Sequence, residues 1–441
     1  MHSQHTIAAI ATPAGAGALA IIRMSGPSAQ AVLFSCTGRK LKPRHATLLS
    51  VLEADGSPLD ECIATLFSAP ASFTGEDVVE IVCHGGMLVT RRVLERLLAS
   101  GAQPAEPGEF SRRAFENGRM DLTQAEAIMD IIQAGSDLAL RAAHSQLRGG
   151  ISAPVIQVID SLIDTAAHIE AYIDFPEEDI APHSRQTLCS AMDTSLATLR
   201  KLMSTAEAGR LLREGVRTAI IGAPNAGKSS LLNCLLGFDR AIVSPTAGTT
   251  RDTVEEAVTL GGLLLRLIDT AGMHDSSDSV EQCGIERAMH ARDTADLILE
   301  VADASLPPRP LPPAPKNTPN ILVLNKCDLQ EHPAWQDAQA IRISCRTGEG
   351  LTALQQAIAD TFAGQNGEQY SAAAINTRHR YALQQAIDCI SAAKTALEHD
   401  HAPELISIDL RAALEALGSI TGKVDTEDIL TRVFSTFCLG K

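Results

Sequence analysis

Residues 216–236 read VRTAIIGAPNAGKSSLLNCLL, and they decide the fold of the middle of the chain. The apolar run 216–221 is followed by 222–229, which has the pattern G-x-x-x-x-G-K-S, and then by a run of helical character. A strand–loop–helix unit is the context that a phosphate-binding loop requires, because its glycines let backbone N–H groups turn toward phosphate oxygens. Lys228 suits the β- and γ-phosphates, and the Ser229 hydroxyl suits Mg²⁺. The stretch predicts a nucleoside-triphosphate site on a parallel βαβ sheet.

A second motif indicates which base this site selects. Residues 325–328 read NKCD and follow the apolar run 321–324. In GTPases the aspartate of NKxD accepts hydrogen bonds from the guanine N1–H and the exocyclic amino group, which adenine cannot supply. Residues 344–346 read SCR and stand where such proteins brace the guanine O6 through a backbone N–H. We therefore expect GTP. The predicted guanine contacts are Asn325, Lys326, Asp328, Ser344, Cys345 and Arg346.

Two segments between these motifs carry the expected ligands of Mg²⁺ and of the γ-phosphate. Residues 269–272 read DTAG, where Asp269 is expected to hold a Mg²⁺-bound water and the Gly272 N–H to contact the γ-phosphate. Residues 249–252 read TTRD and lie where the first switch belongs, so Thr250 is our choice for the second Mg²⁺ hydroxyl. The other predicted nucleotide contacts are Asn225, Ala226, Gly227, Lys228, Ser229, Ser230, Ser244, Pro245, Thr246, Ala247, Gly248, Thr249, Thr270 and Ala271.

The means of hydrolysis are less evident, because Ras-like enzymes place a water-orienting glutamine directly after DxxG and this chain has Met273 there. The nearest acids that follow are Asp275, Asp278 and Glu281. Asn225, inside the loop, allows two interpretations. Its amide oxygen could bind a monovalent cation against the phosphates, where related enzymes place an arginine finger, or it could cap the loop backbone.

Composition sets limits on the rest of the protein. The chain has 441 residues, 45% of them hydrophobic, and a net charge of -16, so an RNA-binding surface would have to be a local patch or be supplied by a partner. The ten cysteines include no C-x-x-C pair or zinc spacing, which argues against a disulfide framework or a structural metal. No apolar stretch is long enough for a membrane span and no signal-like N-terminus is visible, so we expect a cytoplasmic protein without a membrane partner.

Changes in the residue pattern divide the chain into four segments. Residues 1–118 mix β-like runs at 7–10, 19–24 and 78–83 with one expected helix at 87–99, which indicates an α+β domain. Thr123 and Glu126 have the pattern of a capping box that begins a long helical stretch. The predicted domains are 1–118 (α+β), 119–212 (first helical segment), 213–366 (an inserted Ras-like α/β G domain) and 367–441 (second helical segment, with the FCLGK tail).

Several segments outside the G domain resemble one family. They are TIAAIATPAGAGALAIIRMSG at 6–26, FTGEDVVEIVCHGG at 73–86, PGEFSRRAFENGRMDLTQAEAI at 107–128 and FSTFCLGK at 434–441. With the four nucleotide motifs, they make nearly the whole chain resemble the MnmE (TrmE) family of bacterial tRNA-modification GTPases, within the TrmE-Era-EngA-YihA-Septin-like superfamily. The resemblance implies a multidomain protein: an N-terminal tetrahydrofolate-binding and dimerisation domain, and a helical domain that holds an inserted G domain.

The same resemblance implies roles for individual residues. It implies a homodimer whose G domains associate in a K⁺-dependent way, with K⁺ held by Asn225, Ser244, Thr246 and Thr249. Glu281 would then orient the water, Arg251 would support the switch, and Lys228 would complete the catalytic set. For 5,10-methylenetetrahydrofolate, with 5-formyltetrahydrofolate as its analogue, the matching positions are Arg23, Glu80, Arg119 and Lys441. Two positions depart from the family pattern, His274 in place of arginine and Arg119 in place of lysine; Cys438 is left out of the catalytic set.

The function implied by the resemblance is modification of tRNA. With the FAD-dependent partner MnmG (GidA), in a heterotetrameric or larger complex, such proteins add an aminomethyl or carboxymethylaminomethyl group to C5 of the wobble uridine, U34. The alternative is a ribosome-assembly or signalling GTPase that acts as a nucleotide-switched binding module. Such proteins usually carry a basic RNA-binding appendage or a second G domain. This chain has one phosphate-binding loop, and acids outnumber bases after residue 374.

Overall fold

The computed structural model describes residues 5–174, 185–238, 255–268, 292–309, 315, 318–366, 375–399, 401–423, 430, 433, 434, 437 and 440. The chain forms two compact units, Met1–Met129 with Gly418–Lys441, and Asp130–Leu417. Each unit contains a six-stranded sheet. Within the described ranges, no helix combines the length and the apolar character that crossing a bilayer would take. The finer division into four domains stays a prediction.

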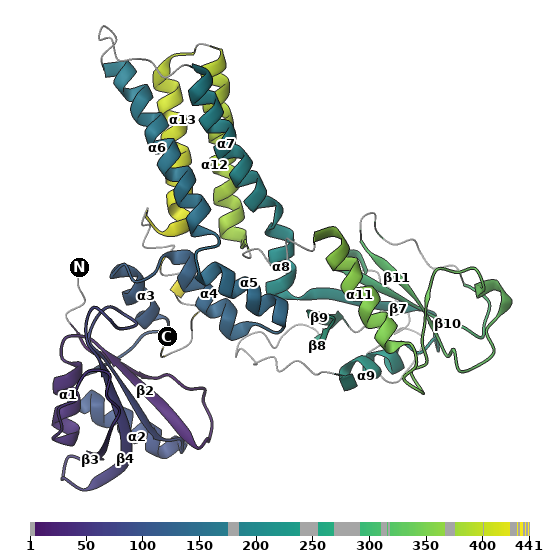
Figure 1. The fold of residues 1–441 in the computed structure, drawn as a ribbon. Coiled ribbons are helices and arrows are strands. Elements are labelled where there is room, and N and C mark those ends of the chain that lie inside the picture. Colours follow the sequence, from purple (N-terminus) through teal and green to yellow (C-terminus); the bar gives the residue numbers. More distant parts are fainter. Residues whose placement is uncertain are drawn as a thin grey trace, which may run out of the picture. The chain divides into compact units, whose positions relative to one another are not determined.

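The first unit is a mixed sheet in the order β3-β4-β5-β2-β1-β6, with two helices packed on one face (Figure 1). Side chains alternate along β2, so Ile22 and Met24 are buried against these helices while Arg23 points to the opposite face. The elements are β1 Ile7–Ile10, β2 Leu19–Ser25, α1 Ala29–Thr37, β3 Thr47–Leu52, β4 Pro58–Phe67, β5 Val78–His84, α2 Met87–Ala99, β6 Gln103–Pro104 and α3 Glu109–Glu116. Helix α4, Leu122–Gln133, begins in this unit and ends in the other.

The expected strands at 7–10, 19–24 and 78–83 and the helix at 87–99 are present, but the expectation of a single helix before residue 118 is wrong. Helices α1 and α3 were missed. In α1 the buried residues include Cys36 and Thr37 as well as aliphatic side chains, so its apolar stripe is poorly marked in the sequence.

The structure also corrects the predicted start of α4. The Asp121 Oδ1 accepts a hydrogen bond from the Gln124 N–H at 2.9 Å, and the Gln124 Oε1 accepts one from the Asp121 N–H at 2.9 Å. This reciprocal pair is the capping box, so the expected pair Thr123 and Glu126 is wrong by two positions. An aspartate with a glutamine three residues later makes the two reciprocal bonds of a capping box, so the helix begins two residues before the predicted position.

The second unit contains the sheet β12-β11-β10-β7-β9-β8, which is parallel except for β8. The expected strand–loop–helix unit is present, with β7 in the interior of this sheet and α9 after the loop. The elements are β7 Val216–Gly222, α9 Lys228–Phe238, β8 Glu255–Leu260, β9 Leu263–Ile268, β10 Leu297–Asp303, β11 Asn320–Asn325, the 3-10 helix η1 Pro333–Trp335, β12 Ile341–Arg342 and α11 Leu351–Asn366.

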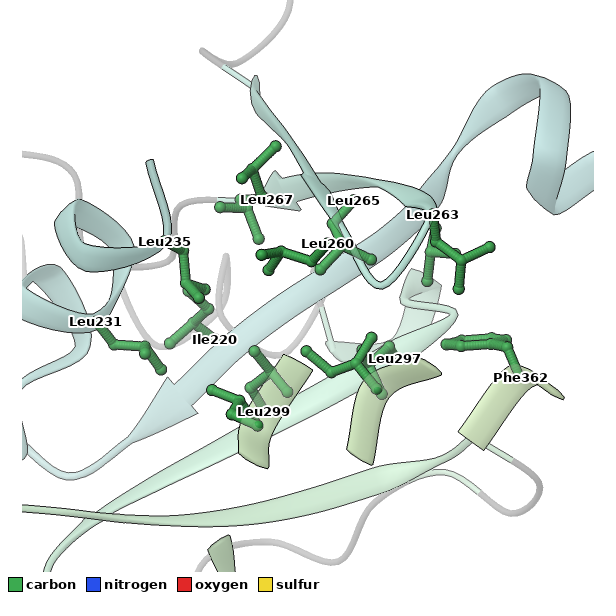
Figure 2. Packing of buried hydrophobic residues seen from close by; sticks show 14 of the residues in the cluster. Ile220, Leu231, Leu235, Leu260, Leu263, Leu265, Leu267, Leu297, Leu299 and Phe362 are labelled. Atoms are coloured by element: carbon green, nitrogen blue, oxygen red, sulfur yellow. The ribbon is translucent and has the colours of Figure 1, made fainter. Parts of the chain in front are cut away.

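One hydrophobic cluster fixes α9 against this sheet. Figure 2 shows Leu231 and Leu235 of α9 beside Ile220 of β7, in the same cluster as Leu299 of β10 and Phe362 of α11. Leu231 is 0% and Leu235 1% exposed, and burial of one such side chain stabilises the fold by about 1.5–3 kcal/mol. This packing holds the first turn of α9 at the end of β7.

Four long helices of the second unit form a bundle (Figure 1). The Lys394 Nζ lies 2.7 Å from the Asp193 Oδ1, which links α12 to α7, and an Arg411 nitrogen lies 2.7 Å from the Glu170 Oε1, which links α13 to α6. Helices α6 and α7 precede the parallel sheet in the sequence, and α12 and α13 follow it. Besides α9 and α11, the helices of this unit are α5 Asp137–Leu147, α6 Ser152–Asp174, α7 Arg185–Ser204, α8 Ala206–Glu214 and α12 Thr377–Glu398. Helix α13, Pro403–Thr421, begins in this unit and ends in the other.

Candidate functional site

The loop between β7 and α9 has the backbone of a phosphate-binding loop. Gly222 has φ +156° and Gly227 has φ +98°. A Cβ atom at Gly222 would run into the Val301 carbonyl oxygen, and one at Gly227 would run into the side-chain nitrogen of Asn325. Both positions therefore require glycine, for conformation and for space.

Lys228 and the serines that follow it stand at the start of α9. The Lys228 Nζ donates hydrogen bonds to the carbonyl oxygens of Gly222 at 3.1 Å and Ala223 at 3.0 Å, so the ammonium group lies over the loop. Ser229 and Ser230 lie in the first turn, and the Ser229 hydroxyl bonds to no other described residue. The first turn of a helix favours anions, and a serine hydroxyl at this position fits a Mg²⁺ ligand.

Asn225 adopts a left-handed backbone, with φ +62°. Its carbonyl oxygen accepts a hydrogen bond from the Lys326 Nζ at 3.0 Å. Its side chain is exposed, and within the described ranges its amide group forms no hydrogen bond. Asparagine tolerates this conformation better than most residues, so the backbone alone gives one reason for it. Among the described residues, the amide does not cap the loop.

Asn325 joins the loop to both guanine motifs. Its Nδ2 donates to the Ala226 carbonyl oxygen at 3.1 Å, and its Oδ1 accepts from the N–H groups of Lys326 at 2.8 Å and Cys345 at 3.2 Å. The side chain is 2% exposed, so these bonds form where water does not compete. The expected neighbours from three separate stretches thus meet at one buried amide.

Asp328 is held ready to accept hydrogen bonds. The Ser344 hydroxyl donates to its Oδ1 at 2.6 Å, and an Arg346 nitrogen lies 2.7 Å from its Oδ2. The hydrogen bond from Ser344, followed by the charge of Arg346, lowers the pKa of Asp328 and keeps it ionised. Burial raises the pKa of the neighbouring Cys345 thiol to about 12, which makes that thiol inert. The arrangement presents a carboxylate acceptor at a position suited to guanine.

Asp303 was not predicted, although it organises the same site. Its Oδ2 lies 2.6 Å from the Lys326 Nζ, and its Oδ1 accepts from the Ser305 N–H and hydroxyl. Burial opposes its ionisation, but the hydrogen bonds from Lys326 and Ser305 together outweigh that effect and lower the pKa of Asp303. The available signal was an aspartate at the end of the largely apolar run 297–302.

Much of the predicted catalytic set lies outside the described residues. These positions include the proposed switch threonine Thr250, the catalytic candidates Arg251 and Glu281, and Met273 and His274, which depart from the expected patterns. Predicted nucleotide contacts and candidate acids outside the described residues are Ser244, Pro245, Thr246, Ala247, Gly248, Thr249, Asp269, Thr270, Ala271, Gly272, Asp275 and Asp278. Cys438, which is not in the catalytic set, also lies outside them. Their roles stay predictions.

The first unit brings together some of the predicted folate set. An Arg23 nitrogen lies 2.8 Å from the Glu80 Oε1, and the guanidinium carbon lies 5.1 Å from the centre of the Phe73 ring. Arg23 also donates to the Gly440 carbonyl oxygen at 3.4 Å, while Lys441 itself is outside the described residues. Arg119 is exposed.

The chemistry of this pair fits a folate. The Glu80 Oε2 accepts no hydrogen bond from any described residue, so it is available to the N–H groups of a pterin. The guanidinium of Arg23 suits a carboxylate, and the ring beside it suits an aromatic partner.

Comparisons with known proteins cover almost the whole chain. The family model "GTP-binding protein TrmE N-terminus" matches residues 6–119, and "MnmE helical domain" matches residues 122–438. A protein of Akkermansia muciniphila named tRNA modification GTPase MnmE is 56% identical over 447 residues, which cover 99% of each chain. A protein of Opitutus terrae with the same name is 44% identical over 452 residues, with 99% of each chain covered.

Among solved structures, Era of Aquifex aeolicus bound to GDP.AlF4- is 26% identical, with 39% of this chain and 65% of that chain covered and a TM-score of 0.26. A TM-score this low supports no conclusion about the fold or the function. The two family models together place both units in one family.

Proposed function

Because the chain belongs to the MnmE family of tRNA-modification GTPases, we propose that it hydrolyses GTP to drive modification of the wobble uridine of tRNA. The observation that carries the nucleotide half of this proposal is the junction at Asn325, which ties the phosphate loop at Ala226 to the guanine loop at Cys345. A site built in this way accepts the base and the phosphates of one nucleotide together. The tRNA half rests on the relatives, since their printed name states that substrate.

Hydrolysis would depend on charge placed around the γ-phosphate. Lys228, which now bonds to two loop carbonyls, would turn to the β- and γ-phosphates. Ser229, with Thr250, would hold Mg²⁺, which neutralises developing charge on the phosphate oxygens. The Asn225 amide oxygen, with Ser244, Thr246 and Thr249, would hold K⁺. Glu281 would orient the attacking water, and Arg251 would support the switch. The cation proposal is supported by the Asn225 amide, which forms no hydrogen bond with a described residue.

Association of two copies would couple hydrolysis to the chemistry on tRNA. We place dimerisation in the N-terminal domains and transient contact in the G domains, across the bound nucleotides. The one-carbon donor, 5,10-methylenetetrahydrofolate, would bind at Arg23 and Glu80, with Arg119 and Lys441 as further ligands. The assignment is supported by a carboxylate and a guanidinium side by side, with one carboxylate oxygen that accepts no hydrogen bond from the described residues.

The partner would be MnmG (GidA), which carries FAD, in a heterotetrameric or larger complex. The product would be an aminomethyl or carboxymethylaminomethyl group at C5 of U34. The net charge of -16 supports this division of labour, because an acidic chain gains from a partner that supplies RNA-binding surface. We place the reaction in the cytoplasm, where tRNA, folate and GTP are all present.

The test is wobble-uridine analysis in bacterial cells. A strain that lacks its MnmE-family gene is complemented with this chain or with its Lys228→Ala variant, and digested tRNA is analysed by mass spectrometry. We expect the wild-type chain to restore the C5-modified uridine and the variant not to restore it, because the variant loses a phosphate contact. Restoration by neither chain would overturn the proposal, and equal restoration by both would remove the role of GTP.

A further inference from the structure

A groove in the second unit has three basic side chains in its lining and no acidic one. It has a volume of about 650 Å³. Its lining consists of Arg141, His144, Ser145, Arg148, Gly149, Gly150, Ala153 and Pro154. We call it the basic groove. In a chain whose net charge is -16, a concave surface without a carboxylate is a local exception.

The basic side chains come from one face of α5 and its C-terminal end. Arg141, His144 and Arg148 are spaced i, i+3 and i+7, which places them on one stripe of a helix. None of the three is buried, while Ala139, Ala142, Ala143 and Gln146 of the same helix are. Small buried side chains pack α5 against its neighbours, so the basic stripe is left facing solvent.

Within the described residues, these three side chains make no contact that would give them a role in holding the fold together. None of them forms a side-chain hydrogen bond or an ion pair with another described residue. Arginines on the neighbouring helix α8 differ, since Arg210 pairs with Asp296 at 2.8 Å and Arg213 with Asp130 at 3.2 Å. A fold uses such pairs to hold elements together, whereas unpaired arginines in a groove remain available to a ligand.

We propose that the basic groove binds the phosphate backbone of the tRNA substrate; this inference rests on the proposed function. Arginine forks donate two hydrogen bonds to a phosphate, and a neutral histidine ring still donates one. The stripe from Arg141 to Arg148 extends about 10 Å along the helix, which is long enough to meet more than one phosphate. Such contacts position RNA without reading its sequence.

The experiment measures binding of an unmodified tRNA transcript to the purified full-length chain by fluorescence anisotropy, over a series of KCl concentrations. The variants are Arg141→Glu, Arg148→Glu and the double change. The matched control is Arg200→Glu, because Arg200 is also an exposed helix arginine with no described side-chain partner and lies on α7, outside the basic groove. GTP turnover is measured for every variant as a check on the fold.

We expect the double variant to bind tRNA at least about tenfold more weakly, with a salt slope lower by about 1 to 2. GTP turnover and the binding of the Arg200→Glu control should match the wild type. Unchanged tRNA binding by the double variant would overturn the inference, as would equal weakening by the control or an absence of tRNA binding by the wild-type chain at low salt.

Complementation separates this inference from the proposed function. If the wild-type chain restores the modified uridine while the double variant binds tRNA normally, only the basic groove is refuted. If the wild-type chain restores nothing, the proposed function is refuted. A double variant that binds tRNA weakly, hydrolyses GTP normally and restores little modified uridine would support both.

Discussion

The side-chain amide of Asn325 donates a hydrogen bond to the Ala226 carbonyl oxygen at 3.1 Å, across 99 positions of sequence. The bond fixes the distance between the base-recognition strand β11 and the phosphate-binding loop. A nucleotide that meets both needs no rearrangement between them, which lowers the entropic cost of binding.

Replacement of this amide should weaken GTP binding. Asn325→Ala leaves the Ala226 carbonyl and the Cys345 N–H without their partner, and we expect the dissociation constant for GTP to rise about tenfold or more. Titration with a fluorescent GTP analogue measures this. The control is Asn320→Ala on the same strand, whose amide bonds to Glu300 in an exposed position and whose loss should leave the affinity unchanged. Equal affinity in Asn325→Ala would refute the role of the junction.

Asp328→Asn should change the base that the site accepts. The aspartate offers only acceptors, which match the N1–H and amino group of guanine, whereas asparagine adds a donor that matches the C2 carbonyl of xanthine. We expect the variant to lose GTP turnover and to gain turnover of xanthosine triphosphate, measured by phosphate release. The Ser344 hydroxyl, which donates to Asp328, can reorient to serve an amide oxygen. Unchanged preference for GTP would contradict the assignment of Asp328 to guanine.

Two substitutions at Asn225 distinguish a role of its amide in binding a cation from a role of its backbone conformation in the loop. Glycine adopts φ +62° without strain, whereas for alanine this conformation costs roughly 1 kcal/mol. If the amide oxygen binds K⁺, GTP turnover in both Asn225→Gly and Asn225→Ala should no longer be faster in KCl than in NaCl. If Asn225 is needed only for its left-handed backbone conformation, the glycine variant should keep the wild-type response to K⁺. Turnover at equal ionic strength decides between these outcomes.

Asp296 should make the stability of the G domain depend on acid pH. Burial opposes its ionisation, but hydrogen bonds from Arg217 and Arg210 outweigh that effect and lower the pKa of Asp296. A lowered pKa stabilises the fold above the unfolded value of about 3.9, and this stability is lost as the pH falls through the folded value. Asp296→Asn should cost about 1.5–3 kcal/mol at neutral pH and much less under acid conditions.

The single tryptophan provides the measurement. Trp335 is 8% exposed and lies in the G domain, so its fluorescence during urea unfolding follows that region of the chain. A difference between wild type and Asp296→Asn that is the same at neutral and acid pH would contradict the linkage.

Short sequence motifs predicted those parts of the site that are formed by neighbouring residues in the chain. The loop between β7 and α9 follows from the spacing of its glycines and lysine, and the strand and helix beside it were placed correctly. The contacts that join the motifs could not be predicted in this way. Asn325 to Ala226, and Arg217 to Asp296 at 3.1 Å, connect residues far apart in the chain, and only the sheet order brings them together.

Errors arose where two patterns compete or where a pattern is weak. Asp121 and Gln124 form the capping box in place of Thr123 and Glu126, because two pairs of polar residues near the helix start have the spacing of a capping box. The missed helix α1 has an indistinct apolar stripe. No sequence motif marks the basic groove. Burial of Ala139 and Ala142 shows which face of α5 packs against the protein, and only then can the exposed face be assigned to Arg141, His144 and Arg148.

The central claim, that GTP hydrolysis on this chain drives modification of tRNA, is tested most directly by reconstitution. The purified chain is mixed with MnmG and FAD, NADH, methylenetetrahydrofolate, glycine or ammonium, and an unmodified tRNA transcript, with either GTP or a non-hydrolysable GTP analogue. Mass spectrometry of the digested tRNA then detects any group at C5 of U34. The account predicts the modified uridine with GTP and not with the analogue. Equal product with both nucleotides, or no product with either, would contradict it.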